Sequence, residues 1–364
     1  MSLDAEVDSR IRVLVVDDSA FMRTALSRMI ACEPDMEVVG TACCATIALE
    51  KVSDLDPDVV TLDLAMPGLD RLRTLRRMMH DFPRPVIMVS AATEKDAVIT
   101  LQALSAGAFD YVPKQLSEKS LEIAHIRDEL ITKIRAAAQL RRRQTTLRDS
   151  RKPPRSTPVE TRSSAPVMVP SIVSIGISTG GPRALEQLLP RFPADFPVPI
   201  LIVQHMPFGY TAAFAQRLDS FCSIKVKEGA QGELIRPATA YIAPAGLHMR
   251  VVTRLSDSKP AINLDKHPEN AMHIPSADEL MISVAQVFKN RAIGVIMTGM
   301  GADGAAGMTA IFRAGGITIG QDEASCAVYG MPRVCAQLGV LTHVLSLSHI
   351  PVQIIKATRQ RKRA

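Results

Sequence analysis

The stretch SIVSIGISTGGPRAL, residues 171–185, decides the fold class of the chain around it. Its apolar, β-branched run from Ile172 to Ile177 predicts a buried strand that ends at Ser178. A Thr-Gly-Gly-Pro turn then leads into a predicted helix. In such a unit the helix start can bind a phosphate through its backbone N–H groups, or the turn can present a nucleophilic hydroxyl. This stretch alone leaves both chemistries open.

The same alternation of strand and helix continues on both sides of this stretch. Before it, five apolar runs each precede a helical pattern: VLVV, VVGTA, DVVTLDL, PVIMVSA and DYVP. After it come two more buried runs, PILIVQH and AIGVIMTG. The short alternating runs TAYIAP, MRVVTRL and AINLDK predict an antiparallel insertion. The predicted fold class is therefore α/β, with two doubly wound parallel-sheet domains, of which the second is larger.

The length of the chain and a change in composition predict where the two domains meet. A chain of 364 residues exceeds the size at which one hydrophobic core keeps growing. Apolar periodicity ends after Lys133, and the chain then fills with Arg, Ser, Thr and Pro up to Pro170. We therefore expect domains at residues 1–135 and 170–364, joined by a basic Pro/Ser/Arg-rich linker at residues 136–169.

The charge distribution and the absence of long apolar runs restrict the classes of partner. The net charge of +6 comes largely from segment 141–155 and the C-terminal RQRKRA. These residues could bind nucleic acid, but a solvated linker and tail explain them more simply, so no nucleic-acid partner is expected. There is no run of eighteen apolar residues and no basic secretory leader. We expect a cytoplasmic protein without direct membrane insertion, whose six cysteines, lacking zinc-site spacing, stay reduced.

Acidic and phosphate-binding residues follow successive strands of the first domain. The strand ends carry Asp17, Asp18, Asp63, Ser90 and Lys114. Because the carboxyl ends of parallel strands meet at one edge of a sheet, these groups are expected to converge. Three carboxylates in one place favour a hard divalent ion such as Mg²⁺, and the lysine and hydroxyl suit a phosphoryl group. The alternative for each residue alone is a helix cap or a loop position.

In the second domain, the phosphate interpretation of the turn after Ile177 is weakened. Its glycines match neither GxGxxG nor GxxxxGK[ST]. A nucleophilic Ser178 would need a base and an orienting acid. Two further strand ends supply them, since His205 follows ILIVQ and Asp303 lies in the glycine-rich GMGADGAAGM. Glycines around Met300 would leave backbone N–H groups free to bind an oxyanion.

Each of these residues also has a structural alternative. Ser178 and Asp303 could cap the helices that follow them. His248 and His273 lie in comparable Pro/Gly-rich loops and compete with His205 for the role of base. Spacing alone therefore leaves a Ser-His-Asp triad as one of several hypotheses.

The first domain resembles the receiver domain of two-component response regulators over residues 10–135. The resemblance rests on VLVVDDSAFMR, DVVTLDLAMPGLD, IMVSA and DYVPK. It implies a flavodoxin-like strand order. It also implies that a histidine kinase of the chemotaxis type phosphorylates Asp63, and that Asp17 and Asp18 bind Mg²⁺ together with Asp63.

The same resemblance extends to the residues around the phosphorylation site. It implies that Ser90 and Lys114 contact the phosphoryl group and that Tyr111 is the switch aromatic. Two positions depart from the receiver pattern. Arg71 stands where receivers usually have glycine, which could alter the helix start near the phosphorylation site. Gln115 stands where many have proline, which could change how the preceding lysine is held.

The chain from about Pro170 onward resembles the catalytic domain of the chemotaxis methylesterase (CheB) family. Six motifs occur in the family's order: IGISTGGPRAL, QHMPFGYTAAFAQRL, YIAPAGLHM, HIPSADEL, TGMGADGAAGM and GQDEASCAVYGMP. The resemblance implies that Ser178 is the nucleophile, His205 the base and Asp303 its orienting acid. It also implies that the backbone amide of Met300 is an oxyanion donor.

Together the two resemblances imply a phosphorylation-activated protein-glutamate methylesterase. The implied reaction removes methyl groups from glutamate esters on the cytoplasmic domains of methyl-accepting chemoreceptors, releases methanol, and extends to deamidation of receptor glutamines. Mg²⁺ serves phosphorylation, and no cofactor is implied for ester hydrolysis. The receiver is expected to cover the active site until Asp63 is phosphorylated. The rivals are a DNA-binding regulator, which needs a helix-turn-helix module, and an inactive scaffold on the same fold.

Overall fold

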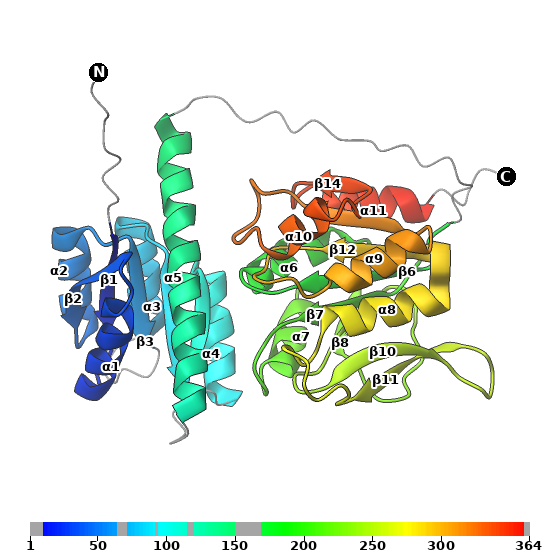
Figure 1. The fold of residues 1–364 in the computed structure, drawn as a ribbon, viewed down its shortest axis with the longest axis horizontal. Helices are drawn as coiled ribbons and strands as arrows, with labels where there is room; N and C mark the ends of the chain where they lie inside the picture. Colours follow the sequence, from blue (N-terminus) through cyan, green and yellow to red (C-terminus); the bar gives the residue numbers. More distant parts are fainter. Residues whose placement is uncertain (1–9, 64–70, 92–93, 115–119, 150–168, 360–364) are drawn as a thin grey trace. The chain divides into compact units, whose positions relative to one another are not determined.

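The computed structural model describes residues 10–63, 71–91, 94–114, 120–149 and 169–359. The chain forms two compact units, Met1–Pro153 and Pro154–Ala364, and each has its own sheet (Figure 1). Among the described residues, none of the helices combines the length and the apolar character that spanning a bilayer requires.

The first unit is built on a five-stranded parallel sheet in the order β2-β1-β3-β4-β5. Its strands are β1 (Ile11–Val16), β2 (Met36–Ala42), β3 (Val59–Asp63), β4 (Val86–Ala91) and β5 (Asp110–Lys114). Its helices are α1 (Ala20–Ala31), α2 (Ala45–Leu55), α3 (Arg71–Asp81), α4 (Glu94–Ser105) and α5 (Ser120–Asp149). Helices α1 and α5 pack on one face of the sheet and α2, α3 and α4 on the other. Burial on both faces explains why most residues of the central strands β1 and β3 are apolar.

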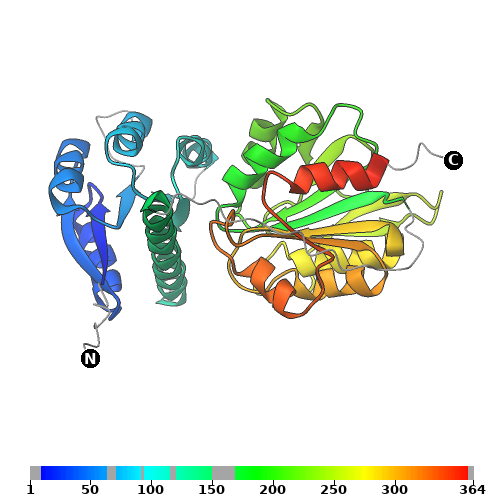
Figure 2. The same cartoon turned by 90° about the horizontal axis from the view of Figure 1, so that it is seen from above.

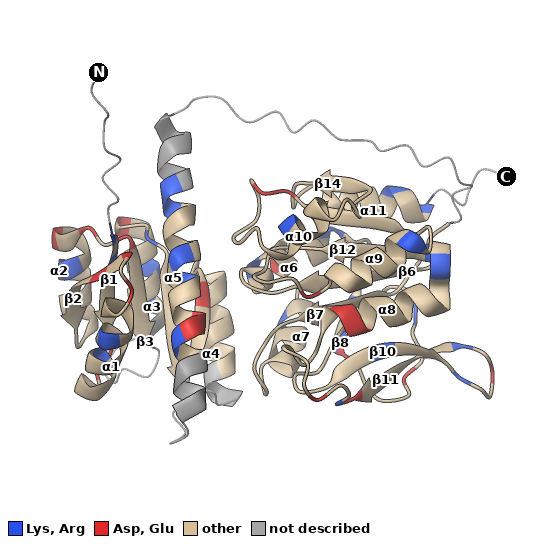
Figure 3. Ribbon diagram, in the orientation of Figure 1, with Lys and Arg blue, Asp and Glu red and all other residues tan. Residues whose placement is uncertain are grey.

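Helix α5 runs further than the composition of the sequence predicted. It continues to Asp149, so the linker that we expected from residue 136 begins as helix. The reason is that its arginines pair with acids that precede strands of the same unit. Arg135 Nε donates to Asp35 Oδ2 at 2.8 Å, and Arg141 Nη1 donates to Asp58 Oδ1 at 3.0 Å. Figure 3 shows acidic and basic residues along this helix. Because linkers are also rich in charged residues, the composition of this segment predicted a linker instead of a helix.

The second unit is built on a seven-stranded parallel sheet in the order β14-β13-β12-β6-β7-β9-β8. Its strands are β6 (Ile172–Ile177), β7 (Ile200–Gln204), β8 (Lys225–Glu228), β9 (Thr239–Ile242), β12 (Ala292–Ile296), β13 (Ile317–Gln321) and β14 (His343–Leu345). A separate antiparallel hairpin consists of β10 (His248–Thr253) and β11 (Pro260–Asp265).

Helices cover both faces of the second sheet. They are α6 (Gly181–Leu188), α7 (Thr211–Asp219), α8 (Ala277–Phe288), α9 (Ala305–Arg313), α10 (Met331–Gln337) and α11 (Ile350–Arg359), with short 3-10 turns at Leu189–Arg191 and Lys289–Arg291. In Figure 2, α8, α9 and α10 lie on one face and α6, α7 and α11 on the other. Both units are therefore doubly wound α/β folds, as predicted.

The predicted antiparallel insertion is partly wrong. The runs MRVVTRL and AINLDK form the hairpin β10–β11, but TAYIAP forms β9, which pairs in parallel with β7 and β8. The physical reason is burial, since Ala240, Tyr241 and Ile242 are all at most 1% exposed. A strand buried on both faces belongs in the interior of a parallel sheet.

The strand, turn and helix that open at Ser171 form as predicted, and their local geometry decides one alternative. Helix α6 is preceded by Gly180, whose φ of 75° suits glycine, and no side chain caps the helix. A Cβ atom at Gly181 would lie 1.9 Å from Gln204 Oε1 and 2.9 Å from Ile177 Cγ1, so a larger residue there would have to displace both side chains. Ser178 is therefore not the N-cap of this helix, and its hydroxyl is left for other chemistry.

Candidate functional site

Ser178 follows β6 at the carboxyl edge of the second sheet, and its backbone is held by two neighbouring segments. Its N–H donates to the carbonyl oxygen of Thr298, after β12, at 3.0 Å. Its carbonyl oxygen accepts a hydrogen bond from Gln204 Nε2, at the end of β7, also at 3.0 Å. The position of Ser178 is thus set by both strands that adjoin β6.

His205 and Asp303 meet at this same edge from β7 and from the loop after β12. The His205 Nε2 to Asp303 Oδ2 distance is 2.7 Å, and the side chains are 10% and 8% exposed. The His205 N–H also donates to the carbonyl oxygen of Ile177, the residue before Ser178, at 3.1 Å. The structure therefore brings the three predicted residues to adjoining strand ends.

Asp303 is held as an ionised acceptor by the N-terminus of α8. It accepts hydrogen bonds from Ser276 Oγ at 2.7 Å, from the N–H groups of Ala277 and Asp278 at 2.7 and 3.1 Å, and from the Gly304 N–H at 3.1 Å. Burial raises the pKa of Asp303, but the hydrogen bond from His205 and those from α8 more than offset it, so that the pKa lies well below its usual range. Helix dipoles favour a negative charge at this end.

The charge on Asp303 determines which nitrogen of His205 can act as a base. An ionised carboxylate only accepts hydrogen bonds, so Nε2 carries the proton and Nδ1 carries the free lone pair. In the part of the chain that the structure describes, Nδ1 is buried and has no hydrogen-bond partner. Ser178 Oγ makes no hydrogen bond to it within the same described residues. The imidazole is thus oriented at Nε2 and has an available lone pair at Nδ1, which is the arrangement that a general base needs. Contact between Nδ1 and Ser178 Oγ would require the two side chains to move closer together.

The glycine-rich loop after β12 passes directly against the serine. A Cβ atom at Gly299 would lie 2.8 Å from Ser178 Cβ, so the loop approaches this closely only because residue 299 is glycine. The Gly299 N–H donates to the carbonyl oxygen of Val328 at 3.0 Å, which holds the loop in place. The next residue, Met300, has an N–H group for which the described residues supply no acceptor. That N–H is available to an oxyanion near Ser178.

The two competing histidines have different surroundings. His248 is fully buried, its Nδ1 accepts from the Ser276 N–H at 3.2 Å, and its Nε2 lies 3.3 Å from the carbonyl oxygen of Pro268. Both of its nitrogens are used, so it is a structural residue. His273 stacks on the ring of His205.

Ser276 is a site residue that the sequence analysis missed. It caps α8, since its Oγ accepts from the Glu279 N–H at 3.4 Å, and the same hydroxyl donates to Asp303. A signal was present in the sequence, because Ser-x-x-Glu before an apolar run is the capping-box pattern. The pattern predicts a helix start but says nothing about which acid will lie beside it.

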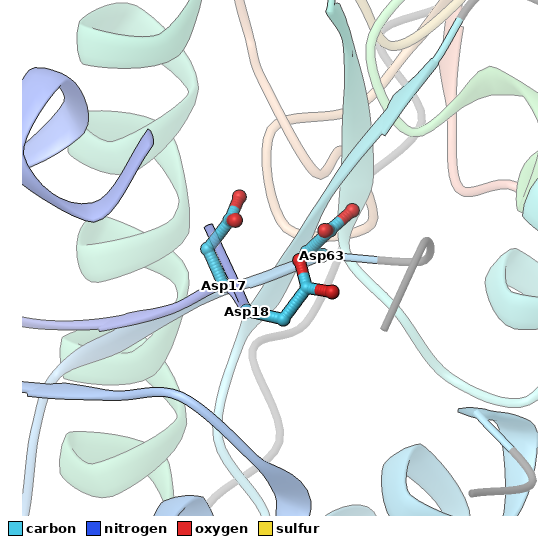
Figure 4. Close-up of side chains that lie close together, drawn as sticks. All are labelled: Asp17, Asp18 and Asp63. Atoms are coloured by element: carbon cyan, nitrogen blue, oxygen red, sulfur yellow. The ribbon is translucent and has the colours of Figure 1, made fainter. Parts of the chain in front are cut away.

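The receiver carboxylates converge at the carboxyl edge of the first sheet, as Figure 4 shows. Ligand oxygens of Asp17, Asp18 and Asp63 all lie within 4.8 Å of one another. Lys114 Nζ lies 2.9 Å from both Asp17 Oδ2 and Asp63 Oδ1, with these two acids almost completely buried. The residue that caps helix α1 is Ser19, which follows Asp17 and Asp18 in the chain and whose Oγ accepts from the Met22 N–H. The predicted acidic cluster is therefore present, and its donor set is oxygen alone.

The other predicted receiver residues lie on the adjoining strands. Ser90 is fully buried on β4, where it pairs with Pro113, and Tyr111 is 4% exposed on β5. Lys133 of α5 has its Nζ 5.2 Å from the centre of the Tyr111 ring. Of the two departures from the receiver pattern, Gln115 lies outside the described residues, as does the side chain of Arg71.

Comparisons with known proteins agree with both halves of this arrangement. The family model described as CheB methylesterase matches residues 173–354, and the response regulator receiver domain model matches residues 13–125. The Pyrococcus horikoshii protein-glutamate methylesterase/protein-glutamine glutaminase is 44% identical over 348 residues, which cover 96% of this chain and 94% of that protein. The second protein of that name from Nitratidesulfovibrio vulgaris is 44% identical over 364 residues, covering 95% of this chain and 98% of that protein.

A solved structure agrees for the second unit. The crystal structure of the Thermotoga maritima CheB methylesterase catalytic domain is similar with a TM-score of 0.50 and 39% sequence identity, covering 52% of this chain and 99% of that chain. The resemblances drawn from the sequence motifs are thus confirmed at the level of the family. The chain belongs to the CheB methylesterase family, with a response regulator receiver domain preceding the methylesterase domain.

Proposed function

We propose that Ser178 is the nucleophile of this protein-glutamate methylesterase and protein-glutamine glutaminase, with His205 as base and Asp303 as orienting acid. The observation that carries the proposal is the 2.7 Å contact of His205 Nε2 with Asp303, which leaves a buried Nδ1 without a partner among the described residues. Such a base, next to the strand end that presents Ser178, has the arrangement that nucleophilic catalysis needs.

The reaction follows from these positions. Ser178 Oγ attacks the side-chain carbonyl carbon of a methylated glutamate, and His205 Nδ1 takes the hydroxyl proton. The Met300 N–H donates to the resulting oxyanion. Collapse breaks the ester C–O bond, and His205 returns the proton to the leaving oxygen, which departs as methanol. Water then attacks the acyl-serine with the same base and releases the glutamate carboxylate. With a glutamine substrate, ammonia leaves in place of methanol.

We further propose that Asp63 accepts a phosphoryl group from a histidine kinase. The three oxygen donors Asp17, Asp18 and Asp63 fit a hard divalent ion such as Mg²⁺, and they would hold it at this edge of the sheet. When bound, the ion neutralises charge on the phosphoryl oxygens. Phosphorylation adds negative charge where Lys114 already bridges two carboxylates, so the lysine must redistribute its contacts.

The regulatory proposal concerns the receiver and methylesterase domains. We keep the predicted ranges 1–135 and 170–364 as their cores, with helix α5 extending the first unit to Asp149. Ser90 and Lys114 contact the phosphoryl group, Tyr111 responds to it, and the unphosphorylated receiver covers the methylesterase site. The substrates are methylated glutamates on the cytoplasmic domains of chemoreceptors, and a substrate carried on a surface helix favours an open active site.

The test is methanol release from methylated receptor membranes. The wild type is compared with Ser178→Ala, each with and without a small-molecule phosphodonor and Mg²⁺. Release that needs Ser178 and rises with the phosphodonor supports both parts of the proposal. Release that survives Ser178→Ala contradicts the catalytic part. If removal of the receiver lowers the activity instead of raising it, simple occlusion is wrong.

A further inference from the structure

We propose that His273 is a positioning residue that holds the ring of His205 in the orientation needed for proton transfer. This inference rests on the proposed function, because His205 is the proposed base. The two imidazole rings are stacked, with centroids 4.2 Å apart and planes 20° from parallel. His273 lies in the loop between β11 and α8, and none of the steps proposed above uses it.

The hydrogen bond to Asp303 cannot fix His205 by itself. A single contact at Nε2 allows the ring to rotate about the line from Nε2 to the carboxylate, and such rotation sweeps Nδ1 away from the serine. A second ring lying flat against the first blocks this rotation, because the rings would have to separate. Nδ1 then keeps its direction although no hydrogen bond within the described residues restrains it.

The segment that carries His273 is itself attached to the site. The carbonyl oxygen of Ile274 accepts from the Gly246 N–H, in the loop after β9, at 3.1 Å. Two residues further on, Ser276 Oγ donates to Asp303 Oδ1 at 2.7 Å. The stacked ring and the orienting acid are therefore connected through three consecutive residues, so His273 has a fixed position from which to restrain His205.

The interaction energy between the two stacked rings also changes during the reaction. When His205 takes the serine proton it becomes a cation, and a cation gains from the face of a neighbouring aromatic ring. The ring of His273 would therefore stabilise the transition state more than the ground state. Interactions of this kind lower the barrier without tightening substrate binding. The expected signature of losing His273 is a lower kcat with an unchanged KM.

The experiment compares three substitutions at this position in the full-length protein, using methanol release from methylated receptor membranes. His273→Phe keeps a flat ring, His273→Leu keeps apolar volume without a flat ring, and His273→Ala removes both. We expect kcat to fall about tenfold in the Leu and Ala variants and to stay within about threefold of the wild type in the Phe variant, as for aromatic pairs. The control is His267→Ala, an exposed histidine in the same loop, which should behave as the wild type.

A spectroscopic measurement accompanies the kinetics. The ¹⁵N signals of the His205 ring report which nitrogen carries the proton, and they should shift or broaden in the Leu and Ala variants but not in the Phe variant. The inference is wrong if all three variants keep the wild-type kcat, if KM alone changes, or if Phe rescues no better than Leu. The comparison of His273→Phe with His273→Leu tests the need for a flat ring even if His273→Ala does not fold.

Failure of this inference can be told apart from failure of the proposed function. Ser178→Ala is assayed in the same membranes. If it keeps the wild-type activity, the proposed nucleophile is wrong whatever the His273 variants do. If it is inactive while every His273 variant matches the wild type, only the inference about His273 fails.

Discussion

The two candidate sites lie at the same place in their sheets, but their carboxylates are held in different ways. In the receiver, Asp17 and Asp63 are gathered by the side chain of Lys114, with Nζ 2.9 Å from each. In the methylesterase unit, Asp303 is held by backbone N–H groups at the start of α8 and by the hydroxyl of Ser276. The carboxylates of the first site are balanced by the charge of a lysine side chain, and the carboxylate of the second by backbone dipoles and a hydroxyl.

The difference matches the role that we propose for each site. A carboxylate that gains a phosphoryl group changes its charge, and a long lysine side chain can follow that change. In the proposed mechanism Asp303 stays ionised throughout, and dipoles that are already oriented need no reorganisation when His205 takes up a proton. The comparison teaches that the surroundings of an acid, more than its position at a strand end, indicate its role.

The largest expected effect, on kcat, comes from removing the negative charge of Asp303, which the N-terminus of α8 stabilises. In Asp303→Asn, the side chain no longer stabilises His205 as a cation and can favour the wrong tautomer, so kcat for methanol release should fall by about 10³ to 10⁴-fold. The control is Asp257→Asn, in the β10–β11 hairpin, where the acid pairs with Arg254 and Lys259 at the surface. A loss of less than about tenfold would contradict the role of Asp303.

The second largest effect is expected at the receiver site, where Lys114 contacts Asp17 and Asp63. Asp63→Asn removes the proposed phosphoryl acceptor, and we expect the stimulation of methanol release by phosphodonor and Mg²⁺ to disappear completely. Asp54→Asn, an exposed residue of α2, provides the matched control and should keep the stimulation. Stimulation that persists in Asp63→Asn would place phosphorylation elsewhere.

A smaller effect is expected when one donor to Asp303 is lost. Ser276→Ala removes both the cap of α8 and the bond to Asp303, so the free energy of unfolding should fall by about 1–2 kcal/mol. We also expect kcat to fall by about tenfold, because the carboxylate can then move. Ser276→Thr keeps the hydroxyl and should restore most of both quantities. Thermal unfolding and kcat together check this, and a change in stability alone would make Ser276 purely a cap.

The smallest effect is the pH dependence of stability. The pKa of Asp303 is lowered in the folded protein, because hydrogen bonds from His205 and α8 outweigh the opposing effect of burial. Its ionised form therefore adds stability that is fully present above the unfolded pKa, near 4, and is lost as the pH falls toward the folded value. The difference in unfolding free energy between wild type and Asp303→Asn should narrow below pH 4. A difference that stays constant from about pH 6 to pH 3 would mean that the charge contributes nothing.

Much of the candidate site could be predicted from the sequence because each residue follows an apolar run. Ser178, His205 and Asp303 each come after a predicted strand, and parallel strands bring such positions to one edge of a sheet. The same logic predicted the receiver acids, although their roles came from resemblance. The spacing of residues could not identify which histidine is the candidate base. His248 lies in a similar loop, but both of its ring nitrogens contact the backbone.

The sequence by itself determined the α/β class, the two domains and the strand ends that carry chemistry, because hydrophobic periodicity is a local property. The tertiary structure alone decided that β9 joins the main sheet, that α5 extends to Asp149, and that His273 stacks on His205. Each of these depends on contacts between residues far apart in the chain. Arg141 pairs with Asp58, and Ser276 with Asp303, only when the chain has folded. Local sequence patterns contain no information on such pairs, because they form only when packing in the folded chain brings the two residues together.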